Sequence, residues 1–319
     1  MARPKRRRSA MPLVVLSDGT RIHVETSGNG VPALVPCVGS SVPFERTFGE
    51  ELKTDIQYNF VEVRGTSRSD GEPSEVASLD RISDDLEEVR QLLGLDKVIA
   101  LGQSRNGMMA AHYAQKYPNS VLHLVTIGTP ASLSMIKNEE YWNAFADDER
   151  KRLRAENDAA MEREGLLDLD NLNTAEKIVR LFDLEGAVYF YDPTTLMNDW
   201  WDASLLSRTF EVVMASNMGW ADFDLVQTLQ NSDVPAFVTF GKYDFMVSPL
   251  PKPGNPVDGK AGLFEDIPGV RVEVFEKSGH FPYWEQEQEF ARRYRDWVAT
   301  LPESAVRAAE AMTPNGIRQ

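Results

Sequence analysis

Apolar residues follow two patterns that alternate along the chain. Short runs that are almost wholly apolar predict buried β-strands at 33–38, 97–103, 121–128 and 234–241. Between these runs, residues 79–94 carry apolar side chains at helical spacing, and residues 105–117 form a second helical stretch that stops at Pro118. Strands that alternate with helices are typical of βαβ units. We therefore expect an α/β fold with a mostly parallel, doubly wound sheet.

Weaker patterns complete this picture at the two ends of the chain. Residues 12–26 alternate around the turn Ser17-Asp18-Gly19 and predict a hairpin. The remaining predicted elements are a helix at 44–54, strands at 57–63 and 270–279, and a C-terminal amphipathic helix at 285–299.

The strand pattern is interrupted between 131 and 231. This stretch contains charged helical segments at 138–164 and 174–184 and an aromatic segment at 189–201, but no convincing strand. We therefore expect one α/β core built from residues 12–130 and 232–300, with a helical insertion at 131–231. Residues 1–11 are expected to form a disordered basic tail, and 301–319 a C-terminal tail.

Composition narrows the class of protein. The 319 residues carry 49 Asp and Glu against 34 Lys and Arg, a net charge of −15, which argues against a nucleic-acid partner. The single cysteine, Cys37, excludes an internal disulfide and fits a cytoplasmic protein. No run is long enough to span a membrane, and the four histidines form no metal-binding motif. We therefore expect neither a metal nor another cofactor, and a small-molecule substrate; the sequence does not indicate an oligomeric state.

The hexapeptide Gly102-Gln103-Ser104-Arg105-Asn106-Gly107 lies where a predicted strand turns into a helix. A nucleophilic serine needs this context, because the sharp turn lifts its hydroxyl above the sheet. The fifth position of the usual G-x-S-x-G pattern is Asn106 here, so the motif is a variant. The alternative is that Ser104 only caps the following helix.

A serine nucleophile needs a histidine base and an acid that orients it. His280 follows the last predicted strand, and Asp244 follows the strand before it, which is the order expected after such a turn. The other histidines fit less well, since His23 lies in the hairpin and His112 inside a helix, and His123 begins a strand. Three further acids, Asp222, Asp224 and Asp233, precede the strand rather than follow it.

The segments 64–71 (RGTSRSDG), 102–107, 234–244 (VPAFVTFGKYD) and 278–286 (SGHFPYWEQ) resemble those of the α/β-hydrolase superfamily. The resemblance extends over residues 12–300, and it is greatest for the lidded branch that includes esterases, lactonases and prolyl iminopeptidases. It implies Ser104 as nucleophile, Asp244 as orienting acid, His280 as base, and a lid at 131–231. The stretch around 34–36 is weakly similar to zearalenone-type lactonases.

The same resemblance implies an oxyanion hole made by backbone N–H groups. One donor is expected from Val38, Gly39 or Ser40, after the third strand, and the other from Arg105, after the nucleophile. The Arg105 side chain could contact substrate or pair with a nearby acid. Glu62 and Arg64 are expected to form a structural network at a turn.

The insertion is rich in aromatic residues and methionines. Most of these side chains are needed for the insertion's own core, but we expect two or three to line an apolar substrate cleft. The predicted substrate-binding residues, from the insertion and the adjacent loops, are Ser41, Trp200, Trp201, Tyr191, Met218, Phe245 and Phe281.

Together these features predict a serine hydrolase that cleaves a carboxylic ester or lactone. The expected substrate is a neutral small molecule with apolar or aromatic bulk, such as the macrolactone zearalenone, and the reaction passes through an acyl-enzyme. One alternative is an aminopeptidase similar to prolyl iminopeptidases. The other is a hydrolase relative that binds a ligand without catalysis.

Overall fold

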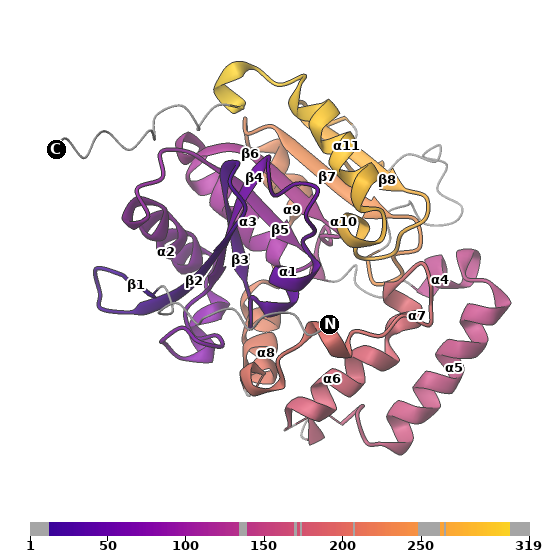
Figure 1. The fold of residues 1–319 in the computed structure, drawn as a ribbon. Helices are drawn as coiled ribbons and strands as arrows, with labels where there is room; N and C mark the ends of the chain where they lie inside the picture. Colours follow the sequence, from indigo (N-terminus) through magenta and orange to yellow (C-terminus); the bar gives the residue numbers. More distant parts are fainter. Residues whose placement is uncertain are drawn as a thin grey trace, which may run out of the picture.

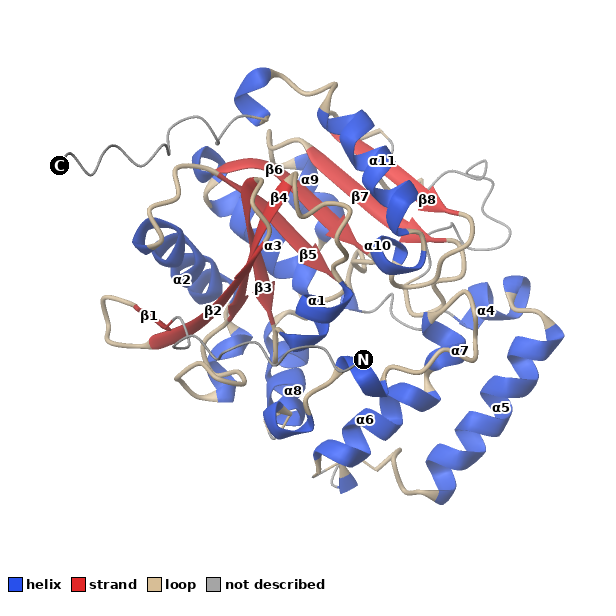
Figure 2. Ribbon diagram, viewed as in Figure 1, coloured by secondary structure: helices blue, strands red, loops and turns tan. Residues whose placement is uncertain are grey.

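The computed structural model describes residues 13–133, 139–168, 171–172, 174–206, 208–247, 262–264 and 266–306. At its centre lies an eight-stranded sheet with the order β1-β2-β4-β3-β5-β6-β7-β8 (Figures 1 and 2). Only the pairs β1–β2 and β2–β4 are antiparallel, so the predicted mostly parallel sheet is confirmed. The strands are β1 (Leu13–Val15), β2 (Arg21–Ser27), β3 (Val31–Cys37), β4 (Ile56–Glu62), β5 (Val98–Gln103), β6 (Val121–Ile127), β7 (Ala236–Gly241) and β8 (Val270–Phe275).

Helices cover both faces of this sheet. Every residue of β5, β6 and β7 is buried, because apolar helix faces pack on each side of the central strands. On one face lie α2 (Leu79–Leu92), α3 (Asn106–Lys116) and α9 (Leu225–Gln230). On the other face lie α1 (Val42–Thr47), α10 (Pro282–Glu285) and α11 (Glu287–Val298).

The predicted elements differ from the observed ones mainly in helix length. The helix predicted at 44–54 is only α1, because the backbone becomes extended at Phe48 and Gly49 then packs against the Glu287 side chain. The C-terminal helix is divided into α10 and α11 at Gln286, which has non-helical angles. The charged stretch 138–164 forms α4 (Glu139–Phe145) and α5 (Asp148–Arg163), since Asp147 caps a new helix by accepting a hydrogen bond from the Arg150 N–H.

The segment between β6 and β7 contains helices and 3₁₀ turns and, in its described part, no strand. Helices α4 to α7 group at one end of the sheet, next to α10 (Figure 1). They include α6 (Ala175–Leu184) and α7 (Gly186–Tyr189), and α5 and α6 pack around a small apolar cluster of their own. Helix α8 (Thr209–Gly219) lies instead against the 3₁₀ turn Pro73–Ala77, where the indole N–H of the following Trp220 donates to the Val76 carbonyl.

Two boundaries of the predicted insertion and tails look different in the structure. Helix α9 packs on the sheet through Leu225 and Leu229, so it belongs to the packing of the core although it lies within 131–231. Residues 301–306 are ordered against the sheet, because the Ala305 carbonyl bonds to His123. The predicted tail at 1–11 and the stretch 307–319 lie outside the described residues. Within the described ranges no helix is both long and apolar enough to cross a bilayer.

Candidate active site

Ser104 occupies a strained turn between β5 and α3. Its φ of 56° lies in the left-handed region, which only Ser67 shares among the described non-glycine residues. The turn is held because the Ser104 N–H donates to the Ile127 carbonyl at 2.7 Å and its own carbonyl accepts from the Gly107 N–H at 3.0 Å. The residue that caps α3 is Arg105, and the Ser104 hydroxyl makes no capping hydrogen bond. Ser104 therefore lies in a strained turn on the cavity and does not cap α3.

The neighbours of Ser104 explain why the motif tolerates Asn106. A side chain at Gly102 would lie 2.4 Å from the Asn106 carbonyl oxygen, and one at Gly107 would lie 1.9 Å from Thr129 Oγ1. Both glycines are thus required for the helix to approach the sheet. Asn106 has a separate role, because its Oδ1 accepts a hydrogen bond from the Val38 N–H at 3.0 Å. The asparagine ties the loop after β3 to the turn that carries the serine.

Asp244 and His280 form a buried pair at the ends of β7 and β8. His280 Nδ1 lies 2.8 Å from Asp244 Oδ2, and the two residues are 2% and 0% exposed. The other carboxylate oxygen, Oδ1, accepts from the N–H groups of Met246 and Val247. These bonds fix the carboxylate, so the imidazole is oriented with Nε2 away from the acid. The three competing acids are exposed, and Asp224 is the N-cap of α9.

The histidine loop is packed directly against the serine turn. The Gln103 side chain donates to the His280 carbonyl at 3.2 Å, and a side chain at Gly128 would lie 2.9 Å from His280 Nδ1. The His280 N–H donates to the Tyr189 carbonyl at 2.6 Å. Among the described residues, no hydrogen bond links the Ser104 hydroxyl to the imidazole, and Nε2 has no partner. The arrangement leaves Nε2 available for a proton of a reacting group.

The insertion helps to hold this histidine. Arg150 on α5 is buried, and its guanidinium donates to the carbonyls of Ala187, Phe190 and Tyr191. These carbonyls belong to the segment whose Tyr189 carbonyl accepts the His280 N–H. Gly279 is required at this contact, because a side chain there would lie 2.1 Å from the Tyr189 oxygen.

The other three histidines lie away from this site. His123 donates or accepts through both ring nitrogens, to the Ala305 carbonyl and the Tyr294 hydroxyl, and burial lowers its pKa to about 4. His112 bonds to Ser83 on the neighbouring helix, and burial lowers its pKa. His23 is buried in the sheet, and neither of its ring nitrogens has a partner among the described residues.

Backbone hydrogen bonds reduce the number of possible oxyanion donors. The Val38 N–H is already bonded to Asn106, and the Ser41 N–H is bonded to the buried Glu62 carboxylate at 2.8 Å. The N–H groups of Gly39, Ser40 and Arg105 make no hydrogen bond with the described residues. These three donors border the cavity beside Ser104. Val38 is thus removed from the predicted set, while Gly39, Ser40 and Arg105 remain.

Ser104 opens into a cavity of 460 Å³ beneath the insertion. Its walls are mostly apolar, because α6 and the segments around it turn aliphatic and aromatic side chains inward. Arg105 and Glu185 are the charged residues in the described lining. The apolar lining residues that were not predicted from the sequence are Pro130, Leu172, Ile178, Leu181, Phe182, Tyr189, Leu206, Val213, Met246 and Val247.

Of the seven predicted substrate-binding residues, the structure places Trp201 on the cavity, stacked on Phe182. The others are absent from its lining. Met218 and Tyr191 point to solvent, with 73% and 41% of their surface exposed. Trp200, Phe245 and Phe281 are buried in aromatic clusters, and Ser41 is bonded to Glu62 and Arg68. Hydrophobic residues alternate between core and cavity within one short segment, so composition did not separate them.

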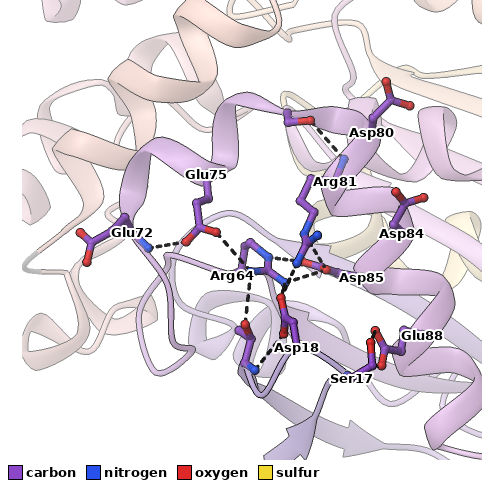
Figure 3. A network of polar contacts seen from close by, with 12 residues as sticks. Ser17, Asp18, Arg64, Glu72, Glu75, Asp80, Arg81, Asp84, Asp85 and Glu88 are labelled. Atoms are coloured by element: carbon purple, nitrogen blue, oxygen red, sulfur yellow. Dashed lines mark hydrogen bonds and ion pairs between the residues drawn. The ribbon is translucent and has the colours of Figure 1, made fainter.

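The described residues contain no group of three histidine, cysteine or acidic side chains placed to hold a metal ion. The two residues expected to form one turn network lie in separate ones, because Glu62 pairs with Arg68 and accepts from the Ser41 N–H. Arg64, just after β4, pairs with Asp18, Glu75 and Asp85 (Figure 3).

Comparisons with a family model, with related sequences and with solved structures all point to one family. A family model described as alpha/beta hydrolase fold matches residues 37–287. The AB hydrolase superfamily protein YclE of Bacillus subtilis (strain 168) is 30% identical over 286 residues, which cover 88% of this chain and 96% of that protein. A proline iminopeptidase of Saccharolobus solfataricus is 25% identical over 76% of each chain. Among solved structures, an esterase of Exiguobacterium antarcticum superposes with a TM-score of 0.60 at 22% identity, covering 91% of this chain and 100% of its own.

Proposed function

Because the chain belongs to the α/β-hydrolase fold family, we propose that it is a serine hydrolase that cleaves a carboxylic ester or lactone through an acyl-enzyme. The observation that carries the proposal is the position of Ser104. It sits in a strained turn on an apolar cavity, next to a buried Asp244–His280 pair that leaves Nε2 free. No other serine among the described cavity residues has that combination of backbone strain and a neighbouring base.

In the first half of the reaction, Ser104 Oγ attacks the carbonyl carbon while its proton passes to His280 Nε2. The tetrahedral intermediate then breaks the bond to the alcohol oxygen, which takes the proton from Nε2 and leaves. Asp244 stabilises the imidazolium that exists between these two transfers. In the second half, a water molecule gives its proton to Nε2 and its oxygen to the acyl carbon, and Ser104 Oγ regains the proton as the acid departs.

The negative charge on the carbonyl oxygen is stabilised by backbone N–H groups. Arg105 supplies one donor and Gly39 or Ser40 the other, since both neighbouring N–H groups are already bonded. A donor of this kind contributes about 3–4 kcal/mol to transition-state stabilisation. Because Asn106 and Glu62 hold the two ends of the loop, these donors are aimed before the substrate binds.

The cavity favours a substrate with apolar bulk near the scissile bond. Apolar walls bind aliphatic or aromatic groups by removing them from water. A lactone is compatible with this site, because its alcohol stays attached to the acyl group, which Ser104 holds covalently until water attacks. The esterase of Exiguobacterium antarcticum, which shares this fold, supports ester hydrolysis as the proposed reaction.

An aminopeptidase is the second candidate, and two observations favour it. Curated relatives that cover most of the chain are proline iminopeptidases. In addition, the carboxylate of Glu185 lines the cavity and could pair with a charged amino group. The same triad would then attack an amide carbonyl.

A substrate panel separates these functions. We expect the wild-type protein to hydrolyse 4-nitrophenyl butyrate or the macrolactone zearalenone faster than prolyl 4-nitroanilide, and Ser104→Ala to abolish turnover of all three while preserving the circular dichroism spectrum. Selective hydrolysis of the anilide would instead establish the aminopeptidase. Turnover that persists in Ser104→Ala would contradict the mechanism, and a wild-type protein inert toward all three would favour a ligand-binding role.

A further inference from the structure

Arg105 places a positive charge next to the nucleophile. It follows Ser104 in sequence and lines the same cavity, whose described walls are otherwise mostly apolar. Its guanidinium reaches across to α8, where Nη1 donates to Ser216 Oγ at 2.7 Å and to Asn217 Oδ1 at 2.6 Å. Both partners are uncharged, so the charge of Arg105 is not compensated on this side.

The other edge of the guanidinium has no partner. Within the described part of the chain, Nε and Nη2 of Arg105 make no hydrogen bond, and the residue forms no ion pair. These two nitrogens lie on one edge of the planar group and present two parallel N–H donors, which is the geometry that binds a carboxylate through both oxygens. The available edge is thus the one best suited to a carboxylate.

The other poorly exposed arginines differ from Arg105, because their guanidinium groups have more partners. Arg64, Arg68, Arg90 and Arg293 are each paired with at least one carboxylate. Arg150 has no carboxylate partner within the described residues, but three backbone carbonyls accept from it, and it lies over the rings of Tyr243 and Phe245. A partly buried charge without such compensation is costly. The chain has 49 acidic residues against 34 basic ones, yet none of the described carboxylates pairs with Arg105. This position is therefore open to a carboxylate from a ligand.

Glu185 is the other charged residue in the described lining of the cavity. Its carboxylate interacts with Tyr189, whose pKa is raised by burial and further by this neighbour. Burial lowers the pKa of Arg105, but a guanidinium remains charged at any pH at which the protein is folded. The cavity therefore offers an approaching substrate a permanent cation beside Ser104.

We propose that the Nε–Nη2 edge of Arg105 binds a free carboxylate carried by the substrate, so that the preferred substrates are monoesters of dicarboxylic acids or esters of carboxylated alcohols. The proposal rests on the serine hydrolase function and specifies its substrate class. It replaces the expectation of a neutral substrate, which depended on net charge and apolar composition and not on the charge beside the nucleophile. A single arginine among apolar walls suits a monoanionic carboxylate better than a phosphate, which needs more donors.

Matched esters test this inference. On the acyl side, 4-nitrophenyl hydrogen glutarate is compared with its neutral amide, 4-nitrophenyl 4-carbamoylbutanoate. On the alcohol side, 4-carboxyphenyl butyrate is compared with 4-carbamoylphenyl butyrate. For at least one pair, we expect wild-type kcat/KM to be 10- to 100-fold higher for the carboxylate, as a charge-assisted bidentate contact implies. The ratio should fall to near 1 in Arg105→Gln and recover in part in Arg105→Lys.

The ratio distinguishes substrate binding from a structural role. If Arg105 only latches α8, Arg105→Gln changes both esters of a pair by the same factor and the wild-type ratio is near 1, which overturns the proposal. Arg152→Gln is the matched control, since it removes a positive charge from an exposed salt bridge on α5, outside the cavity. A ratio that falls equally in this control would indicate long-range charge and would also overturn it.

A binding measurement makes the test independent of turnover. In Ser104→Ala, calorimetry should show 4-phenylbutyrate binding at least 10-fold more tightly than 4-phenylbutyramide, and adding Arg105→Gln should remove the difference. If no ester is hydrolysed but this difference is found, the proposed chemistry fails and the carboxylate site stands. Equal affinities for acid and amide would refute the site even if esters are hydrolysed.

Discussion

The guanidinium of Arg64 and that of Arg105 have opposite surroundings: the first lies in a network of carboxylates and the second borders the cavity. The Arg64 side chain is 4% exposed and is neutralised by Asp18, Glu75 and Asp85 (Figure 3). Among the described residues, Arg105 donates to neutral acceptors alone, through one of its three side-chain nitrogens. Around Arg64 the chain supplies carboxylate partners for the positive charge. Around Arg105 the described residues leave N–H donors unbonded beside Ser104, the proposed nucleophile.

The two regions also differ in their histidines. His123, in the interior, has a partner for each ring nitrogen. His280 has Asp244 on Nδ1 and, among the described residues, nothing on Nε2. Polar groups whose hydrogen-bond partners are all supplied by the fold contribute to stability, whereas groups that keep an unbonded donor or acceptor are available for chemistry. Substitutions in the first region should therefore change the free energy of unfolding, and those in the second should change turnover.

The largest expected effect is on turnover. Asp244→Asn keeps the shape of the side chain and its backbone acceptor but no longer stabilises the imidazolium, so we expect kcat to fall by about 10³- to 10⁴-fold. The melting temperature should stay within a few degrees of wild type. Steady-state kinetics with an aryl ester and thermal unfolding check both parts, and a kcat within tenfold of wild type would remove Asp244 from the mechanism.

Arg64→Met should give the reverse result. Removing the cation leaves the buried Asp85 with only the more exposed Arg81 as a partner, so we expect a loss of about 3 kcal/mol in the free energy of unfolding. In the folded fraction, kcat should change little. The control is Arg81→Met, whose more exposed side chain in the same network should cost less than about 1 kcal/mol.

Arg105→Met provides the direct contrast in stability. Because its guanidinium is desolvated without a carboxylate, replacing it by an apolar side chain should leave the free energy of unfolding unchanged or slightly raise it. Urea unfolding of the two variants measures this contrast. If Arg105→Met lowered the free energy of unfolding as much as Arg64→Met does, the proposed difference between the two arginines would be contradicted.

The interior histidine predicts a pH dependence of stability. Burial lowers the pKa of His123 to about 4, below the value of about 6.5 in an unfolded chain. The unfolded state therefore binds the proton first, and stability is lost as pH falls from 6.5 toward 4, by about 2–3 kcal/mol in total. Burial lowers the pKa of His112 as well, so the two add in the same direction. Urea unfolding between pH 7 and 4.5 should show a shallower slope for His123→Gln; an unchanged slope would assign the effect elsewhere.

The smaller of the two expected effects on kcat concerns the loop that carries an oxyanion donor. Asn106→Ala removes the acceptor for the Val38 N–H, so the loop after β3 loses one of its two anchors. We expect kcat to fall by about 10-fold with little change in KM, corresponding to one lost hydrogen bond. Asn106→Asp retains an acceptor and should recover most of the rate. Equal rates for Ala and wild type would mean that Glu62 alone positions the loop.

Much of the fold could be predicted from the sequence, because buried strands and amphipathic helices have different apolar periods. The mostly parallel sheet and the helix packing on both of its faces follow from that alternation, whereas the order of the strands was visible only in the structure. Helix ends were less accurate, as at Phe48 and Gln286, where backbone angles and close packing end a helix without a change in apolar pattern. The loops that carry Ser104, Asp244 and His280 were identified because they sit directly after strands.

The cavity lining was much harder to predict than these loops. Trp200 and Trp201 are adjacent and equally apolar, yet Trp200 packs on Phe281 and Trp201 faces the cavity. Which way a side chain turns depends on tertiary packing, which periodicity does not record in a short 3₁₀ segment. The role of Asn106 and the unpaired edge of Arg105 depend on contacts between distant segments, so they were visible only in the structure.

The central claim is that Ser104 is a nucleophile activated by His280. The most direct measurement is labelling with a fluorophosphonate, followed by mass spectrometry of the intact protein and of its peptides. The account predicts a single adduct on Ser104, absent in Ser104→Ala and formed at least 10³-fold more slowly in His280→Ala. An adduct on another residue, or equal labelling in His280→Ala, would contradict it.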